Sequence, residues 1–521
     1  MVSARIAHAA RVVVSIAASA VLVASAGCDR AGHPPGTIQV DFEISPLSTD
    51  PRIGTDAASS RLNELIFDSL MKIDRNGEFV GDLAERVERP TPTEIIFHLR
   101  REVRFSDGRE LTARDVKYTY ESIENPELRS PKRASLKELK AIEAPDDFTV
   151  VMTTANPYAP ALEMATEGIV PDGTPPPLKS ASAGPPGSGP FMMLSFTRDE
   201  TAKLERNPLH KFEPNSPAAI LIKIVPDATV RALELAEGVC DFSGNNLEAD
   251  VLPWLRAHPF LKISATPGTT YKYLSFNFRD ARLRDVRVRR AIAYAIDRAT
   301  IVKSMLRDSA RVATGLLAPE NWAYDGDVTA YPYDPERSRQ LLDEAGYPAG
   351  ADGMRRLQID FKTTPEGARL AEVFQAMLQR VGIALNVRTV EFATYYGEIQ
   401  SGNFEMTSLQ WIGINDPNQY YMVFNSTQTP PGMNREYYSN PALDRLVEAG
   451  MRTIDVDERK KIYAQVQRLA ADDLPYVSLW WSDNVAVMNR RLANFEPYPN
   501  GSLRSLATLT LQGPGGAEPS R

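Results

Sequence analysis

The residues best able to carry chemistry are few and scattered along the chain. The five histidines are His8, His33, His98, His210 and His258. None of them lies at the spacing of metal ligands, so no metal site is predicted. Ser188 lies between two glycines, but Pro186 and Pro190 occupy the outer positions, so the nucleophile-elbow pattern fails. Because phosphate-loop and dinucleotide fingerprints are also missing, we expect no catalytic residue, no enzyme activity and no cofactor.

The chain has two cysteines, Cys28 and Cys240. Cys240 lies between a helix pattern and a strand pattern, with no histidine nearby in the sequence. We therefore expect a buried small hydrophobe rather than a nucleophile. If Cys28 is acylated, as argued next, no intramolecular disulfide can form.

The first residues have the pattern of an export signal. Arg5 and Arg11 give a positive start, and residues 12–24 form an apolar run of 13 residues, shorter than the ~20 needed to span a bilayer. Small residues then lead to Cys28, as in the lipobox of bacterial lipoproteins, although Ser25 replaces the usual Leu or Val. We predict a signal peptide over 1–27, a lipid-anchored Cys28 and a tether over 28–36; an uncleaved amphipathic anchor is the alternative. The expected location is the periplasm or cell surface.

Composition and charge describe a large globular protein. The 521 residues are 43% hydrophobic and 24% charged, with a formal net charge of -8. No basic run with interleaved aromatic residues occurs, so we expect no nucleic-acid partner. At about 150 residues per domain, the length suggests roughly three domains or two large lobes.

Helix and strand patterns alternate along the chain. Strands are expected at 94–100 and 149–153, and Thr112 with Asp115 resembles a capping box that opens a helix through residue 123. Apolar periodicity predicts a helix over 370–381 followed by a strand over 383–387, and the same order at 457–471 and 475–481. Alternation of this kind predicts an α/β fold of mixed sheets packed by helices. Residues 171–189 are rich in proline and glycine and read as a loop.

A series of different short motifs is spread along residues 37–512. They are Ser48-Thr49-Asp50-Pro51, Gly81-Asp82-Leu83-Ala84-Glu85, Phe105-Ser106-Asp107-Gly108, Gly187-Ser188-Gly189-Pro190-Phe191, Tyr273-Leu274-Ser275-Phe276-Asn277, Tyr294-Ala295-Ile296-Asp297-Arg298, residues 411–417 and Leu474-Pro475-Tyr476-Val477. Together they resemble extracellular solute-binding protein family 5, the dipeptide- and oligopeptide-binding components of bacterial ABC importers. The stretch 285–306, with apolar residues on one face, reads as a packing helix.

The resemblance implies a two-lobed periplasmic-binding-protein clam of type II with an extra inserted domain. One lobe would combine 37–60, 186–268 and 482–512, with the inserted domain at 61–185. The second lobe would be 269–481, and 513–521 a flexible tail. Such a protein is expected to act as a monomer, to capture a peptide or similar-sized solute by hinge closure, and to deliver it to an ABC permease and its ATPase.

The resemblance also suggests ligand-binding residues. In peptide-binding members, an Asp three residues after the Trp of the late motif pairs with the peptide α-ammonium. Here that Trp is Trp411 and the Asp position holds Ile414, so N-acetylated peptides or non-peptide solutes are expected to bind at least as well as free-amine peptides. Asp416 could take the anchoring role if the loop shifts register; otherwise it is a turn residue before Pro417.

The remaining candidates are the other residues of the late motif and several aromatic or acidic positions. They are Asp50, Tyr273, Ile412, Gly413, Asn415, Trp480 and Trp481. Each aromatic residue among them could equally be core packing. The alternatives that stay open are a non-peptide cargo, such as a nickel chelate, opine, sugar or antibiotic, and a sensory or chaperone-like lipoprotein.

Overall fold

The computed structural model describes residues 34, 36–177 and 184–512. The predicted signal peptide, Cys28 and the tail 513–521 lie outside the described residues. Across the described part of the chain, no helix is both long enough and apolar enough to cross a membrane.

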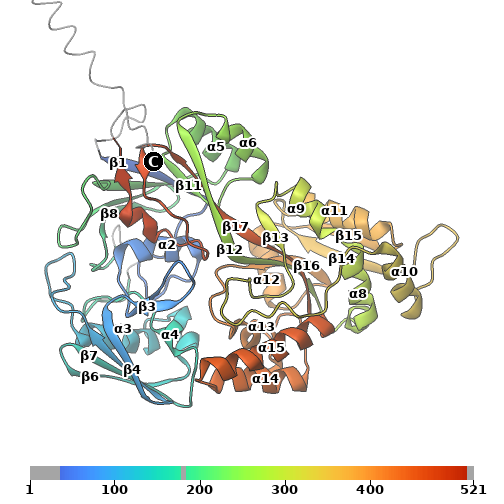
Figure 1. Cartoon of the computed structure of the whole chain (residues 1–521), viewed down its shortest axis with the longest axis horizontal. Helices are drawn as coiled ribbons and strands as arrows, with labels where there is room; N and C mark the ends of the chain where they lie inside the picture. The colour runs from blue at the N-terminus through green and yellow to red at the C-terminus, as the bar shows by residue number, and fades with distance from the viewer. Residues whose placement is uncertain (1–33, 35, 178–183, 513–521) are drawn as a thin grey trace, which may run out of the picture.

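One large sheet runs through the two lobes of the molecule (Figure 1). Its main strand order is β15-β14-β16-β12-β17-β11-β1-β10-β9-β8. The two central strands, β12 (Leu261–Phe276) and β17 (Tyr476–Asn489), are the longest and pair antiparallel, with a register shift between Thr266 and Thr270. Both strands pass from one lobe into the other and therefore connect the lobes.

The first lobe packs short helices against the β1 end of this sheet. Its elements are β1 (Thr37–Phe42), α2 (Ala57–Ile66), β8 (Phe191–Thr197), β9 (Thr201–Arg206), β10 (Ala219–Ile224), α5 (Ala228–Glu237), β11 (Phe242–Gly244), α6 (Leu252–Arg256), β18 (Leu492–Ala493) and β19 (Thr510–Leu511). Strand β1 is buried along its whole length because parallel partners, β10 and β11, flank it on both sides. Cys240 is fully buried beside these strands, as predicted.

A smaller domain is inserted after α2 and has its own core. Its elements are β2 (Met71–Ile73), β3 (Phe79–Gly81), β4 (Ala84–Thr91), β5 (Glu94–Leu99), α3 (Ala113–Glu124), β6 (Leu139–Asp146), β7 (Thr149–Thr154) and α4 (Ala161–Met164). The predicted capping box opens α3, since the Thr112 amide donates to the Asp115 carboxylate at 2.7 Å. Strand β5 alternates half-buried and buried positions, so one face of its four-stranded sheet covers the core that α3 closes.

The second lobe surrounds the β14 end of the large sheet with helices. Its elements are α7 (Ala281–Arg284), α8 (Val286–Ala295), α9 (Arg298–Ser304), β13 (Ala310–Val312), α10 (Pro335–Glu344), β14 (Gln358–Thr363), α11 (Ala368–Gln379), β15 (Ala384–Thr389), α12 (Phe392–Gln400), β16 (Met406–Trp411), α13 (Gln419–Phe424), α14 (Pro441–Arg452) and α15 (Val456–Asp473). The predicted helix and strand at 370–387 correspond to α11 and β15, and the positive φ of Gly382 lets the chain turn between them.

The expected single helix over 285–306 is wrong. The chain leaves helical conformation at Ile296, and Asp297 then caps α9 by accepting the Thr300 amide hydrogen at 3.0 Å. The apolar pattern continued across this break because Ile296 and Val302 are buried in the same core. Ala299, which an unbroken helix would place one turn after the buried Ala295, is exposed.

Candidate functional site

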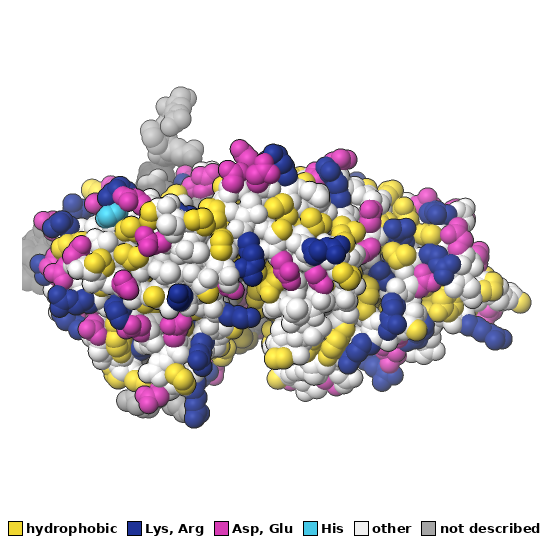
Figure 2. Space-filling view, turned by 90° about the horizontal axis from the view of Figure 1, so that it is seen from below, with side chains coloured by type: hydrophobic (Ala, Val, Ile, Leu, Met, Phe, Trp, Pro, Cys, Tyr) yellow, Lys and Arg dark blue, Asp and Glu magenta, His cyan; other side chains and the backbone are white. Residues whose placement is uncertain are grey.

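Two adjoining cavities lie between the lobes. The larger encloses about 1090 Å³ and the smaller about 620 Å³. Both are lined by Thr166, Glu167, Trp411, Ile412, Gly413 and Asn415. Seen from below, the surface has a notch between the first lobe with its inserted domain, at left, and the second lobe (Figure 2). Charged side chains of both signs surround this notch. The loop after β16 therefore lies at the boundary between the two cavities, which are compartments of one interlobe cleft.

Trp411 ends β16 and is held by a column of aromatic rings. Its indole stacks on Tyr273 with centroids 6.3 Å apart and planes 10° apart, and Tyr273 in turn stacks on Tyr476 at 3.9 Å. The Arg435 guanidinium lies 5.3 Å from the centroid of Trp411. The Trp411 Nε1 hydrogen has no acceptor among the described residues. Trp411 is thus a pre-organised wall of both cavities with one free donor.

The loop 412–416 turns sharply away from this wall. Gly413 has φ +66°, a conformation that side chains disfavour, and Ile412 is 51% exposed on the cleft side. Ile414 lines the larger cavity but is only 6% exposed and packs into the aromatic core of the second lobe. The position at which the resemblance expects a carboxylate therefore offers the cleft an apolar surface.

Asp416 is committed to an ion pair within the second lobe. Its two oxygens accept from Arg459 at 2.6 and 2.8 Å, and Oδ1 also accepts the Asn418 amide hydrogen at 2.7 Å. Both side chains of the pair are nearly inaccessible, at 5% for Asp416 and 6% for Arg459. Asp416 therefore fits the turn-residue reading, with an added structural ion pair, better than the ammonium-anchor reading.

Glu163 enters the larger cavity from the inserted domain. It belongs to the short helix α4. Its side chain is exposed to the cavity, and its carboxylate makes no hydrogen bond or salt bridge with any described residue. Enclosure by protein and the negative charge of Asp416 raise the pKa of Glu163 to about 8, although Arg459 opposes the shift. An acidic group without an ion-pair partner therefore lines the same cavity as the loop 411–416.

The smaller cavity has a polar floor whose charges are mutually paired. Lys72 contacts Asp82 at 2.9 Å, Lys132 contacts Glu167 at 2.5 Å, and Arg504 lies 3.5 Å from Asp82. Each cation lines the cavity while retaining its carboxylate. This floor can supply hydrogen-bond donors to a solute without leaving an isolated charge in the empty cleft.

The other predicted site residues lie outside the lining of the two cavities. Asp50 is 2% exposed and binds Arg52 at 2.7 Å, so it fixes the loop that carries Pro51 into the smaller cavity. Tyr273 is 1% exposed and supports Trp411 from behind. Trp480 and Trp481 are buried in the hydrophobic core of the second lobe. The Trp481 Nε1 hydrogen is donated to the Gly315 carbonyl at 3.1 Å.

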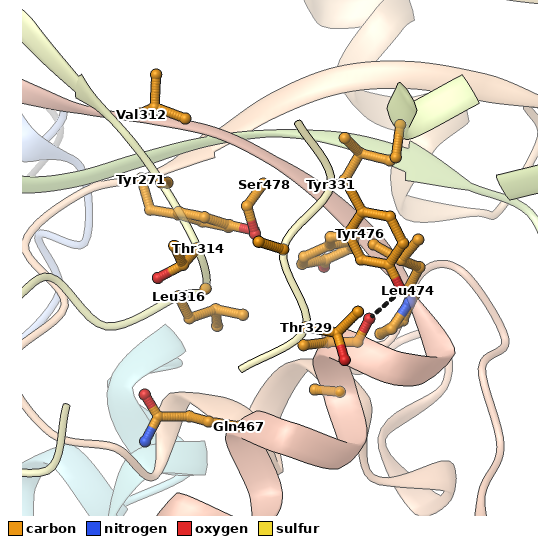
Figure 3. A pocket seen from close by; sticks show the side chains of 18 of the residues that line it. Tyr271, Val312, Thr314, Leu316, Thr329, Tyr331, Gln467, Leu474, Tyr476 and Ser478 are labelled. Atoms are coloured by element: carbon orange, nitrogen blue, oxygen red, sulfur yellow. Dashed lines mark hydrogen bonds between the residues drawn. The ribbon is translucent and has the colours of Figure 1, made fainter. Parts of the chain in front are cut away.

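A third, smaller cavity of about 180 Å³ lies inside the second lobe (Figure 3). The Tyr271 and Ser478 hydroxyls hydrogen-bond at 2.7 Å in its wall, and Gln467 reaches toward it from α15. The Arg298 guanidinium also lines it but is occupied by backbone carbonyls of Ala313 and Ser478. This volume is far below that of the interlobe cleft, and the Tyr271, Ser478 and Arg298 side chains in its wall already have partners within the protein.

Sequence reasoning missed several cleft residues. Glu163, Asn418, Tyr396 and Arg504 line the cavities although no motif marks them. Among the described residues, no group of three or more histidine, cysteine or acidic side chains is arranged to hold a metal ion. The arrangement is a closable polar and aromatic cleft, and it suits reversible binding of a solute.

Comparison with known proteins places this geometry in context. A probable di/tripeptide-binding protein of Pseudomonas aeruginosa (strain UCBPP-PA14) is 27% identical over 506 residues, covering 89% of this chain and 94% of that protein. Heme-binding protein A of Haemophilus influenzae is 27% identical over 438 residues, covering 78% and 79%. The structure of the oligopeptide-binding protein AppA of Bacillus subtilis with a nonapeptide has a TM-score of 0.79 at 24% identity, covering 92% and 99%.

The fold is the two-lobed clam of periplasmic binding proteins. The model of the middle region of the bacterial extracellular solute-binding proteins, family 5, matches residues 78–432, which is more than half of the sequence. This chain belongs to that family of solute-binding proteins.

Proposed function

We propose that this protein captures a peptide between its lobes and delivers it to the permease of an ABC importer. The observation that carries the proposal is the interlobe cleft, whose two joined cavities of about 1090 and 620 Å³ are walled by both lobes. Ligand pockets of drug-sized molecules enclose about 300–1,000 Å³, so the larger cavity alone has room for a short peptide. The relatives named for di- and tripeptides and for oligopeptides support this class of cargo.

We take the moving bodies to be those that the sequence suggested. Residues 37–60, 186–268 and 482–512, with the inserted domain 61–185, would move against residues 269–481. The inserted domain touches the second lobe directly, since the Ala159 amide donates to the Met451 carbonyl at 2.8 Å. A cargo that bridges Trp411 and the inserted domain would stabilise this closed arrangement.

The experiment that tests the proposal is native mass spectrometry of the purified protein, followed by release and sequencing of any bound mass. A peptide cargo is expected, and Trp411→Ala should lose it because that ring walls both cavities. Retention of a porphyrin or metal chelate instead would favour the non-peptide alternative, for which the heme-binding relative is the specific precedent. A chain that neither retains nor binds any solute would contradict the transport function.

We further propose that the mature protein is a monomer anchored to the membrane by lipid on Cys28 and that it has no enzyme activity. Small residues before Cys28 and the apolar run at 12–24 support the anchor. Metabolic labelling with a radioactive fatty acid should label wild type, and Cys28→Ser should be unlabelled and soluble. Equal recovery of both proteins in the soluble fraction, without label, would refute the anchor.

A further inference from the structure

The larger cavity contains a carboxylate that no protein group neutralises. Glu163 faces the cavity, and its carboxylate has no hydrogen-bond or ion-pair partner among the described residues. The two lining carboxylates whose charges raise its pKa are paired: Asp416 with Arg459 at 2.6 Å, and Glu167 with Lys132 at 2.5 Å. When a cargo fills the cleft and displaces the water around this group, an ionised Glu163 becomes costly unless the cargo supplies the opposite charge.

A second, independent group in the same lining also lacks a donor. Asn418 is 5% exposed, and its Oδ1 accepts no hydrogen bond from the described residues. It follows the loop 411–416, so it belongs to the second lobe, whereas Glu163 belongs to the inserted domain. One lobe therefore offers an acidic group and the other a neutral acceptor, and a group rich in N–H donors would satisfy both.

We propose that Glu163 is the specificity-determining residue that binds a primary ammonium group of the cargo, with Asn418 as an auxiliary acceptor. The inference rests on the proposed peptide-binding function and assigns the negative charge to the inserted domain. It replaces the expectation, drawn from Ile414, that a free amine finds no anionic partner in this cleft. An ammonium placed here would make a charge-assisted hydrogen bond to Glu163 beside the apolar surface of Ile414.

The charges around Glu163 fit a carboxylate whose negative charge is neutralised by a bound ligand. The charges that act on it are those of Asp416 and Glu167, which raise its pKa, and of Arg459, which lowers it. With a pKa of about 8, Glu163 is largely protonated in the empty cleft at pH 7. Binding of an ammonium would therefore release a proton from Glu163, whereas binding of a neutral end group would not.

The test is competition between two forms of one peptide mixture. Wild type is incubated with equal amounts of free and N-acetylated tripeptides that lack lysine and arginine, and the captured peptides are quantified by mass spectrometry. We expect wild type to prefer the free amines by about ten-fold or more, and Glu163→Gln to remove that preference. The matched control is Glu138→Gln, which removes a carboxylate from the same lining but leaves Glu163 in place.

Calorimetry in buffers of different ionisation enthalpy provides the second readout. At pH 7, wild type should release close to one proton on binding the free peptides and none with the acetylated ones, and Glu163→Gln should release none with either. An unchanged free-amine preference and unchanged proton release in Glu163→Gln would overturn this inference while leaving peptide binding intact. Failure of wild type to bind either form would instead overturn the proposed peptide cargo, and the inference with it.

Discussion

The buried ion pair between Asp416 and Arg459 allows a sharp test of what the loop after β16 does. Arg459 donates two hydrogen bonds to the carboxylate, at 2.6 and 2.8 Å, and a third from Nε to the Gly450 carbonyl at 2.9 Å. Arg459→Met keeps much of the side-chain volume but leaves the carboxylate buried without its counter-charge. Removing one partner of such a pair costs about 3–5 kcal/mol, so we expect that loss in the free energy of unfolding.

The double variant Asp416→Leu with Arg459→Met should recover part of this loss, because an apolar pair of similar volume often replaces a buried ion pair without cost. The Asn418 amide and the Gly450 carbonyl would still lose partners, which sets a remaining cost of about 1–3 kcal/mol. Urea unfolding followed by circular dichroism of wild type, Asp416→Leu, Arg459→Met and the double variant gives the four free energies of a double-mutant cycle, which should show a coupling of about 2 kcal/mol or more. A loss below 1 kcal/mol in Arg459→Met would refute a structural ion pair.

The same pair distinguishes the two roles open to Asp416. If the carboxylate is structural, Asp416→Asn should lower the free energy of unfolding and leave the ratio of free-amine to N-acetylated peptide affinity unchanged. If it anchors the ammonium, Asp416→Asn should weaken free-amine peptides selectively while the unfolding curve stays at its wild-type position. Titration calorimetry with matched free and acetylated peptides, run beside the unfolding measurement, separates these outcomes.

The remaining predictions concern stability. Gly187→Ala should destabilise the protein by about 1–3 kcal/mol, because an added Cβ would lie 2.0 Å from the Ile66 carbonyl oxygen; an unchanged melting temperature would contradict this. Burial raises the pKa of Glu436 to about 7, so wild type should lose stability as pH rises from about 4.5 to 7. The loss should be about 3 kcal/mol in wild type. Glu436→Gln, which can still accept a hydrogen bond from Ser275, should not show it. If wild type and variant change equally in urea stability between pH 5 and pH 8, this role of Glu436 is excluded. Reductant should leave the melting temperature unchanged, because Cys240 is a buried free thiol, and a fall of several degrees would indicate a disulfide.

The local elements of the fold were largely predictable, but their long-range partners were not. Periodicity located α11 and β15 because each buries one face against a neighbour close in the sequence. The strand predicted at 475–481 continues to Asn489, since its second half pairs with β11 in the other lobe. That extension depends on residues more than 200 positions away, and no local pattern reports it.

The same holds for the binding site: residues marked by a local motif were predictable, whereas residues brought together only by the fold were not. Trp411 was recognisable because it begins the late motif at 411–417, and its stacking partner Tyr273 lies on the neighbouring strand β12. Glu163 carries no such signal, since its four-residue helix has no fixed spacing to the loop 411–416. The net charge of the cleft is a sum over both lobes, so Ile414 in the expected acidic position does not make the cleft neutral. Because Glu163 comes from the inserted domain and the loop 411–416 from the second lobe, a cationic cargo bound at Glu163 in the larger cavity would contact both parts of the protein.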